Sequence, residues 1–144
     1  MPSVLPRRLV PMVDCQAPRF SRSDSNGMCL SADRSAIFVA ESWGRRVSRI
    51  AIGADGAAGR AETHVTVAKD VVIDGLTLDD AGDLLLLCYA PSCVYRYRSD
   101  GELELLIDDL DHSVLCHPTN GVVRGDTLYT ANLGRWHITE IPLT

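Results

Sequence analysis

The sequence predicts an all-β fold, a partial β-propeller of about three blades that each contain four antiparallel strands. Three observations predict it. An Asn-Gly or Asp-Gly pair recurs along the chain, a similar set of short apolar strands follows each pair, and the connections are short and rich in Asp, Gly and Ser. A βαβ fold requires helical periodicity between its strands, and the sequence has none.

The repeat has a period in the middle forties. Asn26-Gly27 is followed 48 residues later by Asp74-Gly75, and that pair is followed 46 residues later by Asn120-Gly121. Two strands and a turn come after each pair, in MCLSADRSAIFVAES, LTLDDAGDLLLLCYA and VVRGDTLYTANLG. Such repetition is typical of propeller blades, because each twisted sheet must bury its two faces against its neighbours.

Further strands complete each unit. The third strand is RVSRIAI from Arg46, VYRYRSD from Val94 and HITEIPL from His137, and a more variable fourth strand is visible in ETHVTVA and ELELLID. We expect IFVAES, LLLLCYA and TLYTANL to lie near one another around a common axis. Residues 1–19 are expected to form an irregular leader, and residues 20–144 the partial propeller domain.

Composition excludes several classes of protein. The chain has 144 residues, is 46% hydrophobic and carries a net charge of -5, which suits one globular domain with a real core. Basic residues cluster only in isolated pairs, so a nucleic-acid binder is not expected. The longest apolar run, around Leu84 to Leu87, is too short to span a membrane. Three prolines interrupt the first eleven residues, which argues against a secretory signal, and we expect a cytoplasmic protein.

The cysteines and histidines give little sign of a metal-binding or catalytic site. The five cysteines are an odd number without zinc-type CxxC spacing, and we interpret them as small buried apolar residues. Cys116-His117 together with His112 forms only one loose group of metal-ligand types, whereas zinc sites usually combine two ligand pairs. We therefore interpret these residues as structural. The sequence also lacks a GxSxG elbow and the glycine-rich phosphate-binding loops.

Three segments resemble the second half of the gluconolactonase and regucalcin (senescence marker protein) family. They are SNGMCLSADRSAIFVAES, IDGLTLDDAGDLLLLCYAPSCVYRYRSDGELELLIDD and HPTNGVVRGDTLYTANLGRWHITEI, and the likeness covers roughly residues 20–144. The resemblance implies a six-bladed propeller that hydrolyses sugar lactones or related esters with one divalent cation in its central channel. Strictosidine synthase-like proteins share the fold and the NG blade opening, but the DG blade and the ANLGRWH ending favour the lactonases.

The resemblance also implies roles for particular residues. Asn26 and Asp74 match the positions that hold the metal, Asp74 is thereby the candidate catalytic residue, and Asn120 matches a channel-lining position. Arg135 is a candidate for contact with substrate. Carboxylate and amide oxygens suit Ca²⁺, Mg²⁺ or Mn²⁺ better than thiolate-loving metals, and Zn²⁺ is kept as a further candidate. The alternative is structural, because Asn-Gly and Asp-Gly are also the commonest tight-turn pairs in β proteins.

Other polar residues follow the strands. Glu41, Tyr89 and Asn132 stand at what we interpret as equivalent strand ends, where they either line a common surface or mark the exit of a strand into solvent. Trp43 and Trp136 follow in corresponding loops and are interpreted as packing residues.

The sequence departs from the family in ways that keep two functions open. The acidic metal ligand of the family, a Glu in a first blade, has no counterpart here, and three blades cannot close a ring. Either a homodimer completes the ring or the chain is a truncated form of a longer enzyme. The first function is a metal-dependent hydrolase of a sugar lactone or similar small ester. The alternative is a non-catalytic propeller fragment that binds a cation or a partner.

Overall fold

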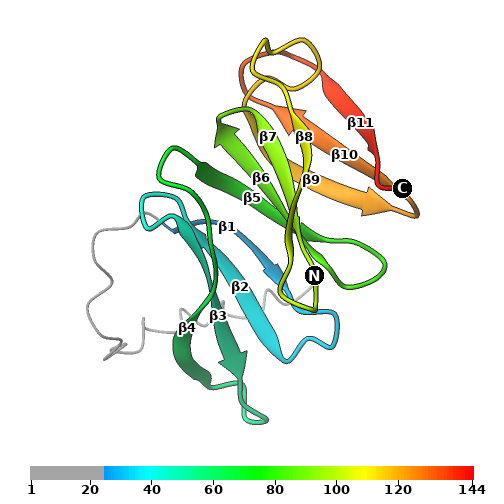
Figure 1. Cartoon of the computed structure of the whole chain (residues 1–144). Coiled ribbons are helices and arrows are strands. Elements are labelled where there is room, and N and C mark those ends of the chain that lie inside the picture. Colours follow the sequence, from blue (N-terminus) through cyan, green and yellow to red (C-terminus); the bar gives the residue numbers. More distant parts are fainter. Residues whose placement is uncertain (1–24) are drawn as a thin grey trace, which may run out of the picture.

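The computed structural model describes residues 25–144, which form eleven β-strands in three antiparallel sheets. The strand orders are β1-β2-β3-β4, β5-β6-β7-β8 and β9-β10-β11. The described residues contain no helix, so the predicted all-β partial propeller is confirmed. Figure 1 shows the sheets following one another in chain order, and we name them blades A, B and C.

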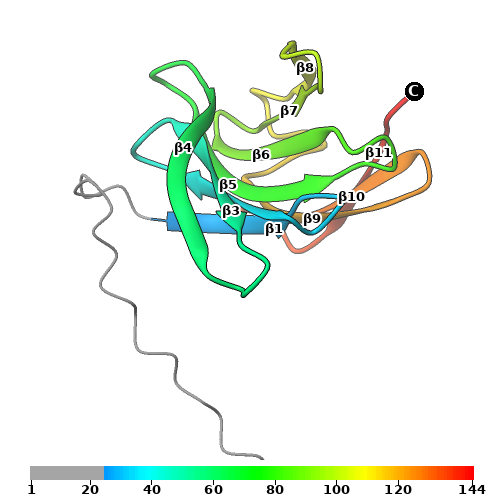
Figure 2. The same cartoon turned by 90° about the horizontal axis from the view of Figure 1, so that it is seen from below.

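Within each blade, consecutive strands of the sequence pair with one another. Blade A contains β1 (Ser25–Leu30), β2 (Ala36–Glu41), β3 (Arg46–Ile52) and β4 (Ala58–Thr66). Blade B contains β5 (Val72–Leu78), β6 (Leu84–Ala90), β7 (Cys93–Tyr97) and β8 (Leu103–Asp108). Blade C contains β9 (Pro118–Arg124), β10 (Thr127–Asn132) and β11 (Ile138–Pro142). The strands predicted from the repeat are therefore present, and Figure 2 shows β4 and β8 at the outer rim of their blades.

Part of the predicted domain arrangement lies outside the described residues. These are the predicted leader, residues 1–19, and residues 20–24 of the predicted propeller domain. Within residues 25–144, no helix is long and apolar enough to cross a bilayer.

The turns between strands use glycine where the backbone enters the left-handed region. Gly56, Gly82, Gly101 and Gly125 have φ angles of 79°, 84°, 92° and 59°. Glycine adopts these values without steric cost, which explains the ADG, AGD, SDG and RGD turns of the sequence.

Blade B is buried on both faces, and this explains its unbroken apolar run LLLLC. Leu84 and Leu86 in β6 join a cluster shared with blade A, which includes Phe38, Val47 and Ile73. Leu85 points the other way, into a cluster with Val94, Leu115, Leu128 and Ile141 that is shared with blade C. Successive side chains of a strand face opposite sides of the sheet, so one strand supplies both interfaces.

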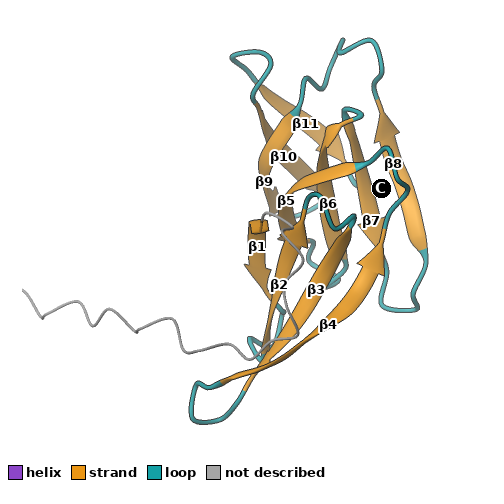
Figure 3. Ribbon diagram, turned by 90° about the vertical axis from the view of Figure 1, so that its left-hand side faces the viewer, coloured by secondary structure: helices purple, strands orange, loops and turns teal. Residues whose placement is uncertain are grey.

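The strands nearest the common axis are β1, β5 and β9. Contacts between blades run from β1 to β5 and from β5 to β9, and Figure 3 shows the three strands following one another along one side of the molecule. The expectation that IFVAES, LLLLCYA and TLYTANL surround the axis is wrong by one strand, because these segments form the second strand of each blade.

The outer faces of blades A and C carry exposed apolar side chains. Met28 and Leu30 in β1 are 63% and 46% exposed, and Val122 in β9 and Ile138 in β11 are 61% and 64% exposed. Propeller blades normally cover such faces with the next blade. Within residues 25–144, the two ends of the row of blades are therefore open apolar surfaces.

Candidate functional site

Two glycines allow the innermost strands to approach closely. A Cβ atom on Gly27 would lie 2.4 Å from the backbone oxygen of Asp74 and 2.7 Å from the Cα atom of Gly75. A Cβ atom on Gly75 would lie 2.5 Å from the backbone oxygen of Thr119 and 3.1 Å from the Cα atom of Asn120. The recurring dipeptides therefore lie next to one another in the order 26, 74, 120.

The interpretation of these dipeptides as tight turns is wrong. Asn26-Gly27 belongs to β1, Asp74-Gly75 to β5 and Asn120-Gly121 to β9. Among the described glycines, those with positive φ are the turn residues instead. At residues 27 and 75 the backbone of the next blade occupies the space of a side chain, and at residue 121 the Leu87 side chain comes closest to that space.

Asn26 and Asp74 form a hydrogen-bonded pair between blades A and B. The Asn26 amide donates one N–H to the Asp74 carboxylate and another to Ser42 Oγ, with an Nδ2–Oγ distance of 3.3 Å. The Ser42 hydroxyl in turn donates to the backbone oxygen of Ile73 at 2.6 Å. The amide nitrogen of Asn26 thus bonds within the protein, and Oδ1 is the atom of Asn26 that is suited to accept a donor or bind a cation.

The environment of Asp74 disfavours its charge. Burial raises the pKa of this carboxyl above its usual range, and the hydrogen bond from Asn26 only partly offsets that rise. A carboxylate that is partly desolvated gains more from a bound cation than one in open solvent does.

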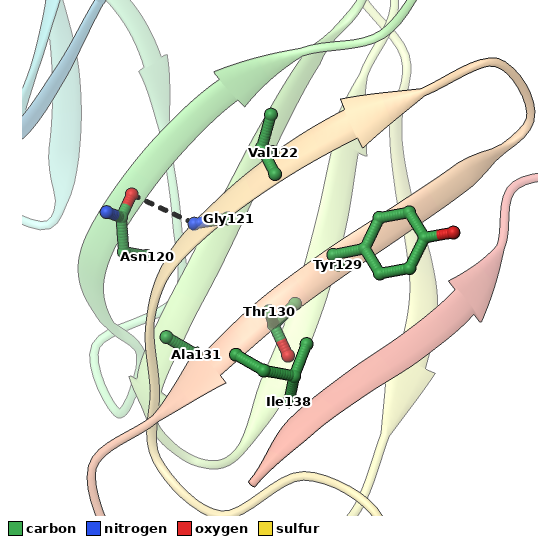
Figure 4. Close-up of a pocket in the computed structure, with 7 residues that line it drawn as sticks. All are labelled: Asn120, Gly121, Val122, Tyr129, Thr130, Ala131 and Ile138. Carbon is green, nitrogen blue, oxygen red and sulfur yellow. Dashed lines mark hydrogen bonds between the residues drawn. The ribbon is translucent and has the colours of Figure 1, made fainter.

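Asn120 lies at the beginning of β9, beside a shallow hollow of about 170 Å³ (Figure 4). Its side chain is exposed, and Oδ1 accepts the N–H of Gly121 at 2.9 Å. Val122, Tyr129 and Ile138 form much of the hollow wall, which places it on the open face of blade C. Asn120 is thus positioned to contact a molecule that lies against this face.

Arg135, the predicted substrate contact, lies in the loop between β10 and β11. It is exposed, and its neighbour Trp136 is fully exposed in the same loop. Trp136 is therefore not the packing residue that the sequence suggested. Trp43 is 63% exposed, and the guanidinium carbon of Arg45 lies 5.7 Å from its ring centroid, which is a cation–π contact.

Two of the three strand-end residues, Glu41 and Asn132, stabilise their own blades. Glu41 is fully buried and accepts hydrogen bonds from the Arg46 guanidinium, at 2.7 and 2.9 Å, and from Ser48 Oγ. In the corresponding place in blade C, Asn132 donates to Thr139 Oγ1 at 3.0 Å. Each polar residue thus joins its strand to the next one in the same blade.

Tyr89 is not the blade B equivalent of Glu41. Glu41 pairs with Arg46 across its hairpin, and the matching pair in blade B is Cys88 with Cys93. These two cysteines are buried in the core, as predicted. Tyr89 is one residue further on, so its side chain takes a different direction and stacks on His117 at a centroid distance of 4.4 Å.

The sequence suggested a structural role for one group that the structure brings together. His112, Cys116 and His117 each offer a ligand atom within 4.8 Å of the others, although their spacing matches no metal-binding motif. The remaining cysteine of the described part, Cys29, is a partly buried free thiol.

Comparison with models of known protein families identifies the family of the chain. Residues 9–130 match the family model described as SMP-30/Gluconolactonase/LRE-like region. The chain belongs to this family. No curated protein matched it significantly in sequence. The resemblance stated from the repeat is therefore confirmed at the level of the family.

Solved structures share the fold of this family member at low sequence identity. A gluconolactonase from Xanthomonas campestris is 23% identical with a TM-score of 0.66, and the match covers 83% of this chain and 38% of that one. A virginiamycin B lyase from Staphylococcus aureus is 16% identical with a TM-score of 0.68, covering 88% and 40%. The periplasmic gluconolactonase of Pseudomonas aeruginosa is 15% identical with a TM-score of 0.55, covering 85% and 44%.

The chain spans about two fifths of the length of these solved relatives. At such identities the likeness concerns the fold of the three blades. The neighbours include both lactonases and a lyase, so the fold supports more than one chemistry.

Proposed function

We propose that this family member acts as a metal-dependent hydrolase of a sugar lactone or a similar small ester. The observation that carries the proposal is the Asn26–Asp74 pair, a partly buried carboxylate bonded to an amide where two innermost strands meet. The lactonase family of the chain supports the substrate class. Asn120, beside Gly75 on the next innermost strand, is proposed to orient the substrate or a water molecule.

The donor set fits a hard divalent cation. Asp74 offers an anionic oxygen and Asn26 a neutral amide oxygen, which are ligand types of Ca²⁺, Mg²⁺ and Mn²⁺. The raised pKa of Asp74 supports the fit, because its cause is burial, and a cation would offset that cost. Two protein ligands are few for Ca²⁺, so water or further protein oxygens must complete the coordination. Zn²⁺, the other metal that the sequence suggested, prefers nitrogen and sulfur ligands and fits this site less well.

The protein residues define the rest of the reaction. A bound divalent cation would polarise the carbonyl of the lactone and lower the pKa of a nearby water. Asp74 is the candidate catalytic residue because its carboxylate can take a proton from the attacking water. Water adds to the carbonyl carbon, the ring C–O bond breaks and the ring oxygen gains a proton, so the product is the hydroxy acid. Arg135 remains a proposed contact for the substrate.

A non-catalytic role is the second candidate, and the open faces of blades A and C favour it. A chain with exposed Met28, Leu30, Val122 and Ile138 has surfaces suited to further protein. In this alternative the chain is a propeller fragment that binds a cation or a partner, or is related to strictosidine synthase-like proteins.

We propose a second copy of this chain as the molecule that covers the open faces. In a homodimer the β1 face of one copy would pack against the β9 face of the other at both ends, which closes a ring of twice the number of blades. Both faces are apolar, so each can bury the other. A cytoplasmic location belongs to the same proposal, and the four free cysteines of the described part fit a reducing compartment.

The test is hydrolysis of gluconolactone, followed as acid release at constant pH. The protein is first treated with a chelator and then supplied with Ca²⁺, Mg²⁺ or Mn²⁺. The proposal expects cation-dependent turnover that Asp74→Ala abolishes and Asp80→Ala, which removes an exposed turn carboxylate, leaves unchanged. Turnover that survives chelation or the loss of Asp74 overturns the metal-dependent hydrolase. Cation binding without turnover favours the non-catalytic alternative.

A further inference from the structure

We propose that His112, Cys116 and His117 form a separate metal site for a thiophilic ion such as Zn²⁺. The three residues lie in the connection between β8 of blade B and β9 of blade C. One ligand atom from each lies within 4.8 Å of the others. Two imidazole nitrogens and one thiolate are ligands that select Zn²⁺ over Ca²⁺ or Mg²⁺, so this site differs in chemistry from the oxygen donors of Asn26 and Asp74.

Two contacts with Tyr89 fix the tautomer and the ring position of His117. Its Nδ1 lies 2.7 Å from the backbone oxygen of Tyr89, which can only accept a hydrogen bond, so Nδ1 carries the proton. The lone pair is therefore on Nε2. The ring also stacks on Tyr89, with an interplanar angle of 23°. A backbone carbonyl that fixes one nitrogen while the other faces the ion is the usual outer shell of a histidine ligand.

Ser92 connects the two histidines. Its Oγ accepts the backbone N–H of His117 at 2.9 Å and lies 2.9 Å from Nδ1 of His112. When Nε2 of His112 binds a metal, its Nδ1–H donates to this hydroxyl. The two rings already lie beside each other, with centroids 4.8 Å apart.

The sulfur of Cys116 has a space made by glycine. A Cβ atom on Gly134 would lie 2.4 Å from Cys116 Sγ and 2.9 Å from Cδ2 of His117. Gly134 also donates its backbone N–H to the backbone oxygen of Cys116 at 3.0 Å. Cys116 is buried, and coordination to a cation is a common way to stabilise a buried thiolate.

The carboxylate of Asp109 holds the connection in shape. It accepts the backbone N–H groups of Val114 at 2.6 Å, Leu115 at 2.7 Å and Ser113 at 3.1 Å. His112 and His117 both have positive φ angles, of 55° and 56°, which cost energy in a residue other than glycine. The segment is thus held with its ligands gathered at one side, independently of any ion.

The geometry requires only a small contraction. Zn–N bonds of about 2.0–2.1 Å and Zn–S bonds of about 2.3 Å separate tetrahedral ligand atoms by roughly 3.5 Å. The present separations are no more than 4.8 Å, so closing them to that value takes at most about 1 Å of movement, which small rotations within the present rotamers supply. Three protein ligands leave the fourth position for water or another small ligand, as in zinc sites that are not purely structural.

Co²⁺ titration of the whole chain, followed by absorption spectroscopy, tests the site. We expect a thiolate-to-cobalt charge-transfer band together with the intense visible bands of tetrahedral Co²⁺, and displacement of both by Zn²⁺. Cys116→Ser should remove the charge-transfer band, and Ser92→Ala should weaken Zn²⁺ binding by about 10–100-fold. Cys15→Ser and Cys29→Ser are the matched cysteine controls, and Asp74→Asn leaves the site intact.

A second measurement does not depend on variants that must fold. The ring-nitrogen NMR signals of the wild-type histidines should report the Nδ1–H form of His117 and a large shift of two Nε2 signals when Zn²⁺ is added. The proposal is overturned if folded wild type shows no thiolate band at saturating Co²⁺, if the band persists in Cys116→Ser, or if Zn²⁺ leaves the histidine signals unchanged.

Discussion

Gly27 and Asp74 are in backbone contact across the interface between blades A and B. A Cβ atom on Gly27 would lie 2.4 Å from the backbone oxygen of Asp74, closer than real Cβ contacts come. The absence of a side chain at residue 27 therefore lets β1 reach β5, and the same approach brings the Asn26 amide to the Asp74 carboxylate. Blade packing and the candidate site depend on the same glycine.

Replacement of Gly27 by Ala should destabilise the fold. The new methyl group meets backbone atoms, which cannot rotate away, and such overpacking costs about 1–3 kcal/mol. Urea unfolding of both proteins measures the change. Gly125→Asn is the control, because Gly125 has open space around its Cβ position and Asn tolerates its φ of 59°. Equal losses of unfolding free energy in the two variants would show that the contact between β1 and β5 is not tight.

Asp74→Asn should stabilise the protein when no divalent cation is present. The folded pKa of Asp74 is raised, so the fold favours the protonated carboxyl, and stability is lost as the pH rises through that pKa. The variant should therefore melt at a higher temperature than wild type near pH 7 and at the same temperature near pH 3. The gain in unfolding free energy near pH 7 should be less than about 1 kcal/mol, because solvent screens a partly exposed group. Thermal melts at the two pH values give the answer, and a variant less stable than wild type near pH 7 would contradict it.

Asp109 should make the stability of the fold depend on pH in the acidic range. Hydrogen bonds from the backbone N–H groups of Val114 and then Leu115 lower its pKa from 3.8 to about 2. A lowered folded pKa means that the stabilisation is present above the unfolded pKa and is lost as the pH falls towards about 2. Asp109→Asn should lower the melting temperature at neutral pH, and the gap should close in acid. A gap that is constant with pH would indicate a role other than the charge.

The homodimer predicts the effect of a charge on the open face of blade C. Ile138 is 64% exposed, so Ile138→Lys should not disturb the isolated chain but should bury a charge in the dimer. Sedimentation over a range of concentrations should give a dimer for wild type and a monomer for the variant. Leu105→Lys, on the outer strand β8 of blade B, is the control that stays dimeric. A monomeric wild type would refute the second copy as partner.

The blades could be predicted because their signals are local. Alternating apolar residues and glycine turns recur with the blade, so strands such as RVSRIAI were found at the right residues. The run LLLLC in β6 is apolar without a break because blade B has a neighbouring blade on each of its two faces.

The position of the candidate site within the blade could not be predicted in the same way. An Asn-Gly pair looks the same in the sequence whether it forms a hairpin turn or part of an innermost strand. Only the backbone of the next blade, which is far away in the sequence, distinguishes the two cases. The equivalence of Tyr89 with Glu41 is wrong because a shift of one residue along a strand reverses the direction of the side chain. His112, Cys116 and His117 meet through bonds to Ser92, Asp109 and Tyr89, which no ligand spacing reveals.

Paramagnetic broadening of amide NMR signals by Mn²⁺ tests most directly whether Asn26 and Asp74 hold a cation with Asn120 nearby. At less than one equivalent of Mn²⁺, the amide signals of Gly27 and Gly75 should disappear first and that of Gly121 should follow, and excess Ca²⁺ should restore them. Asp74→Ala should abolish the effect, and Asp80→Ala should not. Broadening that begins at the surface turns, or that is unchanged in Asp74→Ala, would contradict the cation site.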